Sequence, residues 1–260
     1  MKKTRIPFNY TRIYMGRPYV LDLEGAEGKI TLHIPTVGEI VDLGDDDFYG
    51  SLYYIIGNTT MFRALLWDLK MDWNEISDFQ MFCLLYKGID PKVSQMLLGF
   101  DVSQFKMYEK TLKGEEDSKE VILYNPDLHI EINEKVYTYI QQYYQFVFQI
   151  VPEDKFTDDK ILKRWWIQKD KREAKFNKDK NKDASLQPLI SSLVNHAGFK
   201  YNLEELSNVN IAFFYDAVKR LQIFEECTAL LKGEYSGFID KSKIPTTATD
   251  WMQDFNATAK

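Results

Sequence analysis

A long amphipathic helix in the last quarter of the chain is the strongest structural signal in the sequence. Between Val209 and Leu231 apolar side chains recur at helical spacing, and Gly233 follows where helices commonly end. At ~1.5 Å per residue this helix is roughly 35 Å long, enough to cross a domain. Its apolar stripe must be covered by Leu189, Leu193 and Leu206 or by a partner chain. The stripe comprises Phe214, Val218, Leu221, Phe224 and Leu231.

The chain is long enough and apolar enough to fold around a sizeable core. Its 260 residues, 45% of them hydrophobic, suit one large domain or two small ones. The 16 Tyr, 17 Phe and 5 Trp make an aromatic share of 15%. Tyr and Trp are favoured at protein interfaces, so an oligomer or a scaffold partner explains this share. A Tyr-rich ordinary core, or an AT-rich genome, explains it equally well.

Charge and cysteine content exclude several classes of protein. The net charge of −6, from 33 basic and 39 acidic residues, argues against duplex nucleic acid as the main ligand. Cys83 and Cys227 lie in apolar helical patterns, which predicts buried free thiols rather than a disulfide framework. The sequence shows no secretory signal pattern and no apolar run long enough for a membrane span. We therefore expect a protein of the reducing cytoplasm.

Turn and capping signals predict a mainly α fold with small β elements, an α+β class. Residues 19–23 and 29–34 favour an N-terminal β-hairpin around a Gly-bearing loop. A helical body follows, because helix N-caps or capping boxes recur at short intervals. They are Thr36 with Glu39, Asp45 to Asp47, Thr60, Ser77 with Gln80, and Asp90 before Pro91.

Residues 105–112 and 121–124 predict an inserted β-hairpin with a charged tip, joined by residues 129–132. This hairpin either projects as an arm or packs on the core as a small sheet. A helix capped by Asn133 and running through Ile150 follows. Its aromatic side chains occupy more than one face, which fits a helix buried on most sides and an oligomer interface equally.

Residues 169–183 combine seven basic with four acidic side chains and mark the clearest boundary in the chain. They form a solvated helix face or a tether, in continuation of a helix that begins at residues 157–159. We therefore divide the chain into an N-terminal hairpin and helical body (1–168), a charged linker or exposed helix (169–184), and a C-terminal helical subdomain with a flexible tail (185–260).

The sequence contains no catalytic motif. His33, His129 and His196 are isolated, and none has metal-ligand spacing. The acidic cluster at residues 42–47 lacks the EF-hand pattern, so helix capping is a better explanation than metal binding. Nucleophile-elbow, Walker A and dinucleotide-binding patterns are absent from the sequence. We expect a protein that is not an enzyme and has no catalytic, cofactor or metal site.

One stretch, Lys160 to Lys182, combines basic and stacking side chains that can grip single-stranded nucleic acid. Interspersed acidic residues repel phosphate, and a solvated helix face explains the stretch as well. The residues of this nucleic-acid alternative are Lys163, Arg164, Trp165, Trp166, Lys171 and Arg172.

Two segments resemble proteins of tailed bacteriophages. Residues 34–42 (IPTVGEIVD) resemble the opening of small phage proteins in which a hairpin leads into a helical body. Residues 229–240 (ALLKGEYSGFID), with Asp250-Trp251-Met252, are similar to C-terminal segments of tail-module proteins, near the tail assembly chaperones, of phages that infect Gram-positive hosts. The resemblance implies a non-enzymatic role in building the tail, in the host cytoplasm or in the virion, and it transfers no catalytic residue.

These observations predict a phage tail-assembly or virion structural protein that acts by protein–protein contacts. A tail assembly chaperone binds the apolar helices of the tape-measure protein, so tape-measure or other tail proteins, and a second copy of the chain, are the expected partners. We expect no membrane partner. The candidate partner-binding residues are Tyr139, Tyr143, Tyr144, Phe214, Leu221, Phe224, Tyr235 and Phe238.

Overall fold

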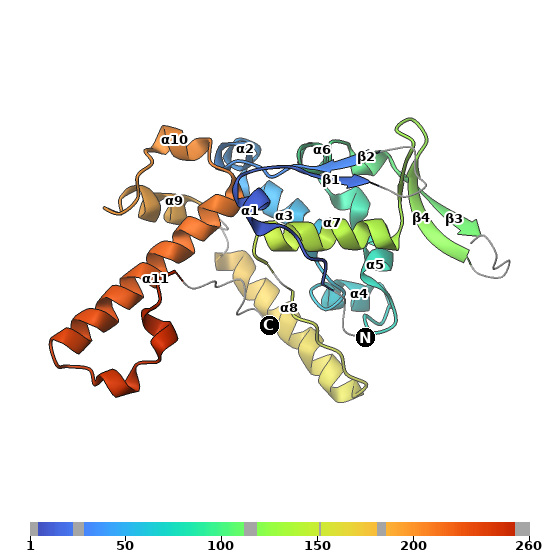
Figure 1. The fold of residues 1–260 in the computed structure, drawn as a ribbon. Coiled ribbons are helices and arrows are strands. Elements are labelled where there is room, and N and C mark those ends of the chain that lie inside the picture. The colour runs from blue at the N-terminus through green and yellow to red at the C-terminus, as the bar shows by residue number, and fades with distance from the viewer. Residues whose placement is uncertain (1–4, 23–28, 112–118, 151, 181–185, 253–260) are drawn as a thin grey trace.

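The computed structural model describes residues 5–22, 29–111, 119–150, 152–180 and 186–252. Within these residues the fold is mainly helical with two small antiparallel sheets, which confirms the predicted α+β class. Figure 1 shows a central helical body, a sheet at one end, and two long helices that extend away from the body. Short 3-10 turns occur at Tyr86–Gly88, Val102–Gln104, Lys241–Lys243 and Thr246–Thr249.

The predicted N-terminal hairpin is present. Strands β1 (Tyr19–Asp22) and β2 (Lys29–Leu32) pair antiparallel, and a short helix, α1 (Tyr10–Tyr14), precedes them. Ile30 and Leu32 are fully buried, whereas the residues that alternate with them along β2 are exposed. This alternation places one face of the hairpin on the core. The loop predicted at residues 24–28 lies outside the described residues.

Helices α2 (Val37–Leu43) and α3 (Asp45–Ile56) form where the capping signals predict them. The Thr36 hydroxyl accepts from the Glu39 N–H at 3.2 Å, and the Glu39 carboxylate accepts from the Thr36 N–H at 2.7 Å. This reciprocal pair satisfies two backbone donors that the helix itself leaves unpaired. The three aspartates 45–47 occupy the first turn of α3, near the positive end of its dipole.

Helices α4 (Arg63–Asp68), α5 (Asp78–Leu85) and α6 (Pro91–Leu98) follow, and α5 begins at the predicted Ser77 capping box. The prediction that Thr60 caps a helix is wrong. The Thr60 hydroxyl instead accepts from the Lys155 N–H at 3.0 Å and donates to the Lys155 carbonyl oxygen, so it holds a distant segment. Lys155 lies 95 residues from Thr60 in the sequence, so the local pattern around Thr60 gives no sign of this contact.

The inserted β element is a three-stranded sheet in the order β3-β4-β5, made of Lys106–Thr111, Lys119–Asn125 and Ile130–Ile132. The sequence predicted either a projecting arm or a small sheet packed on the core, and each describes part of this sheet. Leu123 and Ile132 are fully buried against the core, whereas Met107 and Tyr108 on the edge strand are about half exposed. In Figure 1 the ends of β3 and β4 extend beyond the helical body.

Helix α7 (Glu134–Val147) crosses the centre of the body and begins at the predicted cap, Asn133, whose side chain accepts from the Val136 N–H. It ends at Val147, before the predicted Ile150, and Gln149 beyond it has a left-handed backbone with φ +54°. Side chains on most of its faces are buried, which supports the buried-helix interpretation of its aromatic residues. They are Val136, Tyr137, Ile140, Gln141, Tyr143, Tyr144 and Val147.

Helix α8 (Lys160–Lys180) starts where the sequence predicts, since the Asp159 carboxylate accepts from the N–H groups of Ile161 and Leu162. The charged stretch from Lys169 continues this helix without a break through Lys180, and residues 181–183 lie outside the described chain. The predicted boundary at residue 168 therefore falls inside one helix. The subdomain division itself stays a prediction.

Helices α9 (Gln187–Val194), α10 (Leu203–Ser207) and α11 (Ile211–Tyr235) complete the fold. The first half of this region belongs to the main core. The Val37 N–H donates to the Val209 carbonyl at 2.9 Å, and the Ile211 N–H donates to the Pro35 carbonyl at 2.8 Å. Leu186, Leu193, Leu206, Ile211 and Phe214 are buried in the same hydrophobic cluster as the helical body.

Candidate protein-interaction surfaces

The outer part of α11 and the segment after it form a projecting arm, which we define as residues 218–252. In Figure 1 α11 leaves the body and the C-terminal segment returns along it. The Cys227 thiol contacts the Ala248 carbonyl oxygen at 3.2 Å, and Arg220 donates to the Trp251 carbonyl oxygen at 3.1 Å. The arm is therefore the outer part of α11 together with a segment that folds back along it, residues 236–252, which we call the strap. It is attached to the body at one end.

A glycine pair makes the reversal at the tip of the arm. Gly237 has φ +74°, a left-handed conformation that favours glycine. The N–H groups of Phe238 and Ile239 both donate to the Gly233 carbonyl oxygen. A Cβ on Gly233 would lie 2.5 Å from Ile239 Cδ1, so this position needs glycine for close packing. The prediction that α11 ends at Gly233 is wrong, because the helix continues to Tyr235 and Gly237 takes the left-handed position.

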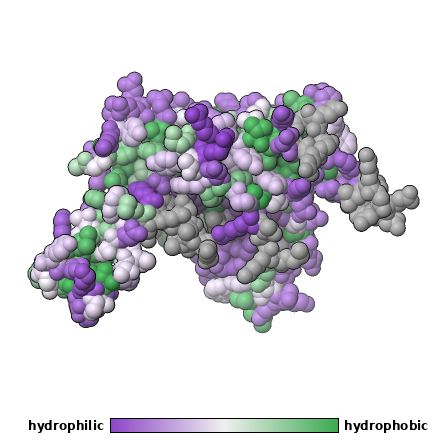
Figure 2. Space-filling model, viewed as in Figure 1, coloured by the Kyte–Doolittle hydropathy of each residue, from purple (hydrophilic) through white to green (hydrophobic). Residues whose placement is uncertain are grey.

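The arm carries a concentration of exposed apolar side chains. Burial of α11 in the core ends early along the helix, since Cys227 is its one buried residue beyond Asp216 in the described chain. Figure 2 shows hydrophobic patches on the visible face of the arm, at the lower left. Large exposed patches on a soluble protein commonly mark contact sites. The residues, with their exposed fractions, are Phe224 46%, Tyr235 83%, Phe238 90%, Trp251 50% and Met252 69%.

The predicted partner-binding residues divide into two groups. Phe214, Tyr143 and Tyr144 are fully buried, so the prediction that these three meet a partner is wrong. The Tyr144 hydroxyl lies between the carbonyl oxygens of His33 and Leu97 in the core. The other five reach the surface to different degrees. Phe224, Tyr235 and Phe238 are exposed on the arm, and Tyr139 and Leu221 are half-buried.

Tertiary contacts with segments distant in the sequence explain why predicted partner-binding residues such as Tyr143 are buried. Tyr143 lies edge-on to Phe8, with ring centroids 5.5 Å apart, and 5.6 Å from Tyr19. Both rings come from the N-terminal segment, which covers the face of α7 that the helical pattern leaves open. Burial also raises the pKa of the Tyr143 phenol. The sequence reasoning did not select Trp251 and Met252 as partner-binding residues, although both are exposed on the arm.

Helix α8 holds the residues of the nucleic-acid alternative, and two of its cations already face carboxylates. Lys163 pairs with Asp72, and Lys171 pairs with Asp68 at 2.5 Å. The Lys163 ammonium also lies 5.4 Å from the centre of the Trp73 ring. These contacts hold α8 against α4 and the segment after it, and they lower the positive charge available to phosphate.

The aromatic residues of α8 are engaged in a similar way. Trp166 lies under the Arg63 guanidinium, 5.3 Å from the ring centre, and is packed beside a small core of its own with Ile167 and Leu66. Trp165 is half exposed, with the Lys169 ammonium 5.8 Å from its ring centre. Arg164 and Arg172 are exposed, and the Arg172 Nε donates to the Gln168 carbonyl oxygen within the helix.

The titratable groups do not assemble into a metal centre among the described residues. His33 and His196 each contact one carboxylate, Glu39 at 3.1 Å and Glu225 at 3.1 Å. Cys83 and Cys227 are buried free thiols, as predicted, and burial raises the pKa of Cys83 to about 12. In the part of the chain that the structure covers, no helix has the length and apolar character to cross a bilayer.

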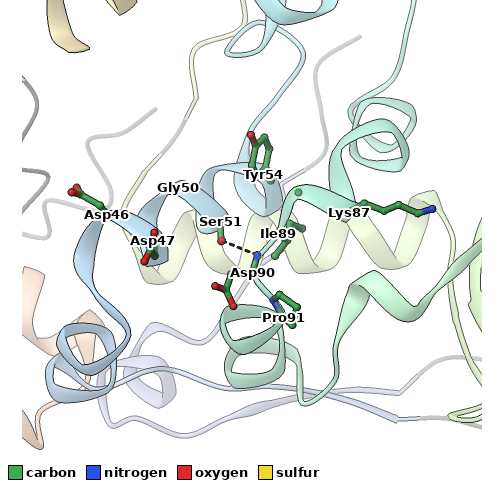
Figure 3. A pocket seen from close by; sticks show the side chains of 10 residues that line it. Asp46, Asp47, Gly50, Ser51, Tyr54, Lys87, Ile89, Asp90 and Pro91 are labelled. Carbon is green, nitrogen blue, oxygen red and sulfur yellow. Dashed lines mark hydrogen bonds between the residues drawn. The ribbon is translucent and has the colours of Figure 1, made fainter. Parts of the chain in front are cut away.

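An open cleft of about 480 Å³ lies between α3 and the start of α6. Figure 3 shows the carboxylates of Asp46, Asp47 and Asp90 around it, with the Lys87 side chain extending away. The Asp90 N–H donates to Ser51 Oγ at 3.0 Å, and the Asp90 carboxylate caps α6. These bonds give Asp90 a structural role, Asp46 and Asp47 lie in the first turn of α3, and we assign no ligand to the cleft.

Comparisons with known proteins are informative for the C-terminal part of the chain. No curated protein and no solved structure matches the chain. Residues 177–256 match a family model described as the YomV second domain, and the matched range contains the whole arm. The matched range also contains residues 229–240, one of the two segments that resemble phage proteins. The other segment, residues 34–42, lies outside the matched range. The match covers just under a third of the chain, and over residues 177–256 this protein therefore carries a domain similar to a phage-related family.

Proposed function

We propose that this protein is a non-enzymatic phage protein of tail assembly or of the virion, and that it acts by protein–protein contacts through its arm. The observation that carries the proposal is the coincidence of two features. The arm exposes large apolar side chains, and the same residues lie within the range that matches a phage-related family.

The arm has the chemistry of a contact surface for apolar helices. Phe238 is 90% exposed and Met252 69% exposed, at the tip and at the returning end of the strap. Aromatic side chains bury a large area at low cost in conformational entropy, and flexible Met side chains adapt to varied apolar partners. The apolar helices of a tape-measure protein are the partner of this proposal, and the protein would keep them from aggregating until the tail tube forms.

Affinity capture from phage-infected cells tests the proposal. The full chain should retain tail proteins, identified by mass spectrometry, and a Phe238→Ser, Met252→Ser variant should lose them. Met107→Ser is the matched control, because Met107 is an exposed apolar residue on β3, outside the arm. Equal capture by all three proteins, or capture of no tail protein by the unmodified chain, would refute the proposal.

The nucleic-acid alternative has a separate test. Lys163 and Lys171 are ion-paired in the structure, so α8 offers fewer phosphate contacts than its sequence suggests. We expect no shift of single-stranded DNA or RNA in a gel at about 50 mM salt, where phosphate contacts are strong. A shift that Arg164→Glu and Arg172→Glu abolish would instead establish the alternative.

A further inference from the structure

The strap lies over a stripe of α11 that has the spacing of a helix-pairing seam. The residues of this covered stripe are separated by three, four, three and four positions, which places them on one face of the helix. The middle of the stripe is apolar, a charged residue lies at each end, and its length is ~21 Å at ~1.5 Å per residue. The covered stripe comprises Arg220, Ile223, Cys227, Leu230 and Glu234.

Contacts at the root and in the middle of the arm place the strap on this stripe. The Arg220 guanidinium donates to the Trp251 carbonyl oxygen at 3.1 Å. The Phe224 ring beside it meets the Trp251 ring edge to face, with centroids 6.2 Å apart. The Cys227 thiol donates to the Ala248 carbonyl oxygen at 3.2 Å. Cys227 is only 3% exposed, although it lies on the part of α11 outside the body.

The strap also contacts the charged residue at the outer end of the stripe. The Lys241 ammonium lies 3.1 Å from the Glu234 carboxylate. The strap therefore supplies a carbonyl oxygen to the cation at one end of the stripe and a cation to the carboxylate at the other end.

The contacts that hold the strap are weak. The Lys241 side chain is 84% exposed, so solvent screens its ion pair. Within the described residues of the strap none is buried. Beyond Ile239, the backbone–backbone hydrogen bonds that the structure describes in the strap join strap residues to one another. A segment held in this way opens at a lower free energy than the whole fold.

We infer that the strap is an autoinhibitory cover, which moves off α11 while the rest of the fold stays intact and so uncovers the stripe for an apolar helix of a partner. Gly237 lies where the strap leaves the helix, and its left-handed backbone, with φ +74°, makes this junction a hinge. The partner in this inference rests on the proposed function, whereas the opening of the strap does not.

The covered stripe determines what the partner helix must present. Ile223, Cys227 and Leu230 require an apolar seam about four turns long. Arg220 requires a hydrogen-bond acceptor or a carboxylate near one end of that seam, and Glu234 requires a Lys or Arg near the other. The occupant is therefore an amphipathic helix with opposite charge preferences at its two ends, and the strap imitates these two polar contacts in the closed arm.

The opened strap remains part of the contact surface. Phe238 and Met252, which the proposed function assigns to a partner, are already exposed in the closed strap. They do not hold the strap shut, and they stay available to a partner helix when it opens.

Alkylation of the purified full chain by N-ethylmaleimide tests the opening. Cys227 lies under the strap and Cys83 lies in the main core, and peptide mass spectrometry follows the two thiols separately. Cys227 should react at least about tenfold faster than Cys83, and its rate should rise less steeply with urea, because opening the strap exposes little surface. Equal rates at the two thiols, or equally steep urea dependences, would overturn the inference.

Variants of the strap identify it as the cover. Trp251→Ala and Lys241→Glu each remove a contact with α11 and should raise the Cys227 rate about threefold to tenfold, with no change at the core thiol. Trp165→Ala removes a tryptophan of α8 that is 50% exposed, as Trp251 is, and Lys243→Glu makes the same charge change two residues along the strap. Neither control should change the Cys227 rate. If both strap variants react at the unmodified rate, the strap is not the cover and the inference fails.

Capture from phage-infected cells tests the partner. Lys241→Glu should retain about threefold more tail protein than the unmodified chain, because a larger fraction of the protein is open before binding. Lys243→Glu should retain the unmodified amount. Equal retention by all three proteins would overturn the autoinhibitory role and leave the proposed function standing. Retention by none would refute the proposed function and the partner with it, while the alkylation rates still decide whether the strap opens.

Discussion

Arg63 on α4 and Asp170 on α8 form a two-pronged ion pair, with Nε–Oδ2 at 2.5 Å and Nη2–Oδ1 at 2.6 Å. The Arg63 side chain is 10% exposed and the Asp170 side chain 23% exposed. The pair joins residues 107 positions apart in the sequence and holds the middle of α8 on the body.

Removing one partner of this pair should destabilise the fold. Asp170→Ala leaves the Arg63 guanidinium largely buried without its carboxylate, and we expect a loss of about 2–4 kcal/mol in the free energy of unfolding. Urea denaturation measures it. Glu173→Ala, which breaks an exposed pair with Lys169, should cost under ~0.5 kcal/mol. Equal effects of the two substitutions would show that α8 does not depend on the buried pair.

Gly38 tests whether the C-terminal region is part of the main core. A Cβ at this position would contact the Ser207 hydroxyl and lie 2.9 Å from the Ser207 carbonyl oxygen, so α2 and α10 would have to move apart. Gly38→Ala should lower the free energy of unfolding by about 1–3 kcal/mol.

Gly50 is the matched control for this substitution. It lies inside α3, and in the part of the chain that the structure describes nothing lies within 4 Å of an added Cβ. Gly50→Ala should therefore stabilise the protein by about 0.5–1 kcal/mol, because alanine is the better helix former. Thermal unfolding of both variants checks the pair, and stabilisation by Gly38→Ala would contradict the packing of α10 on α2.

Gln149 carries two unfavourable features at the end of α7. Its backbone is left-handed, with φ +54°, and both polar atoms of its side-chain amide are buried without a hydrogen-bond partner among the described residues. Gln149→Gly relieves both, and we expect a gain of about 1 kcal/mol in the free energy of unfolding. Lys70→Gly, at an exposed left-handed residue with φ +65°, relieves backbone strain alone and should gain less. A larger gain at Lys70 would contradict this account.

Asp72 should contribute to the loss of stability in acid. Burial acts to raise its pKa, but hydrogen bonds from Lys163 and from the Asn74 N–H lower it, and the pKa lies below its ordinary value. The folded state therefore binds this proton less tightly than the unfolded chain does. The stabilisation is present above the unfolded-state pKa and is lost as the pH falls through the folded-state pKa.

Unfolding free energies measured from about pH 7 to about pH 3 test this linkage. Asp72→Asn should be less stable at neutral pH and should lose less stability in acid than the unmodified chain. Asp68→Asn, which removes a more exposed carboxylate from its pair with Lys171, should cost less stability at neutral pH than Asp72→Asn does. A parallel pH profile for Asp72→Asn and the unmodified chain would contradict the assignment.

Local signals in the sequence predicted much of the fold. The capping boxes at Thr36 and Ser77 each form with both hydrogen bonds, because their donors and acceptors lie within three residues of each other. The β elements also form in the predicted order, since turn residues and alternating patterns act over short distances.

Contacts between distant residues account for what could not be predicted. Thr60 holds Lys155, and Tyr143 is covered by Phe8 and Tyr19, and neither relationship leaves a local pattern. The same limit applies to the candidate surface. The sequence selected Phe224, Tyr235 and Phe238 as candidate partner-binding residues together with the buried Tyr143, Tyr144 and Phe214, and only the structure shows which of them are exposed.

Site-specific photo-crosslinking at Phe238 in phage-infected cells tests the central claim most directly. A photoreactive aromatic residue in place of Phe238, which is 90% exposed at the tip of the arm, should form a covalent product with a phage tail protein. The same residue in place of Met107 on β3 should not form that product. The absence of any tail-protein product at Phe238, in cells where the protein accumulates and the tail is assembled, would contradict the role of the arm as a contact surface.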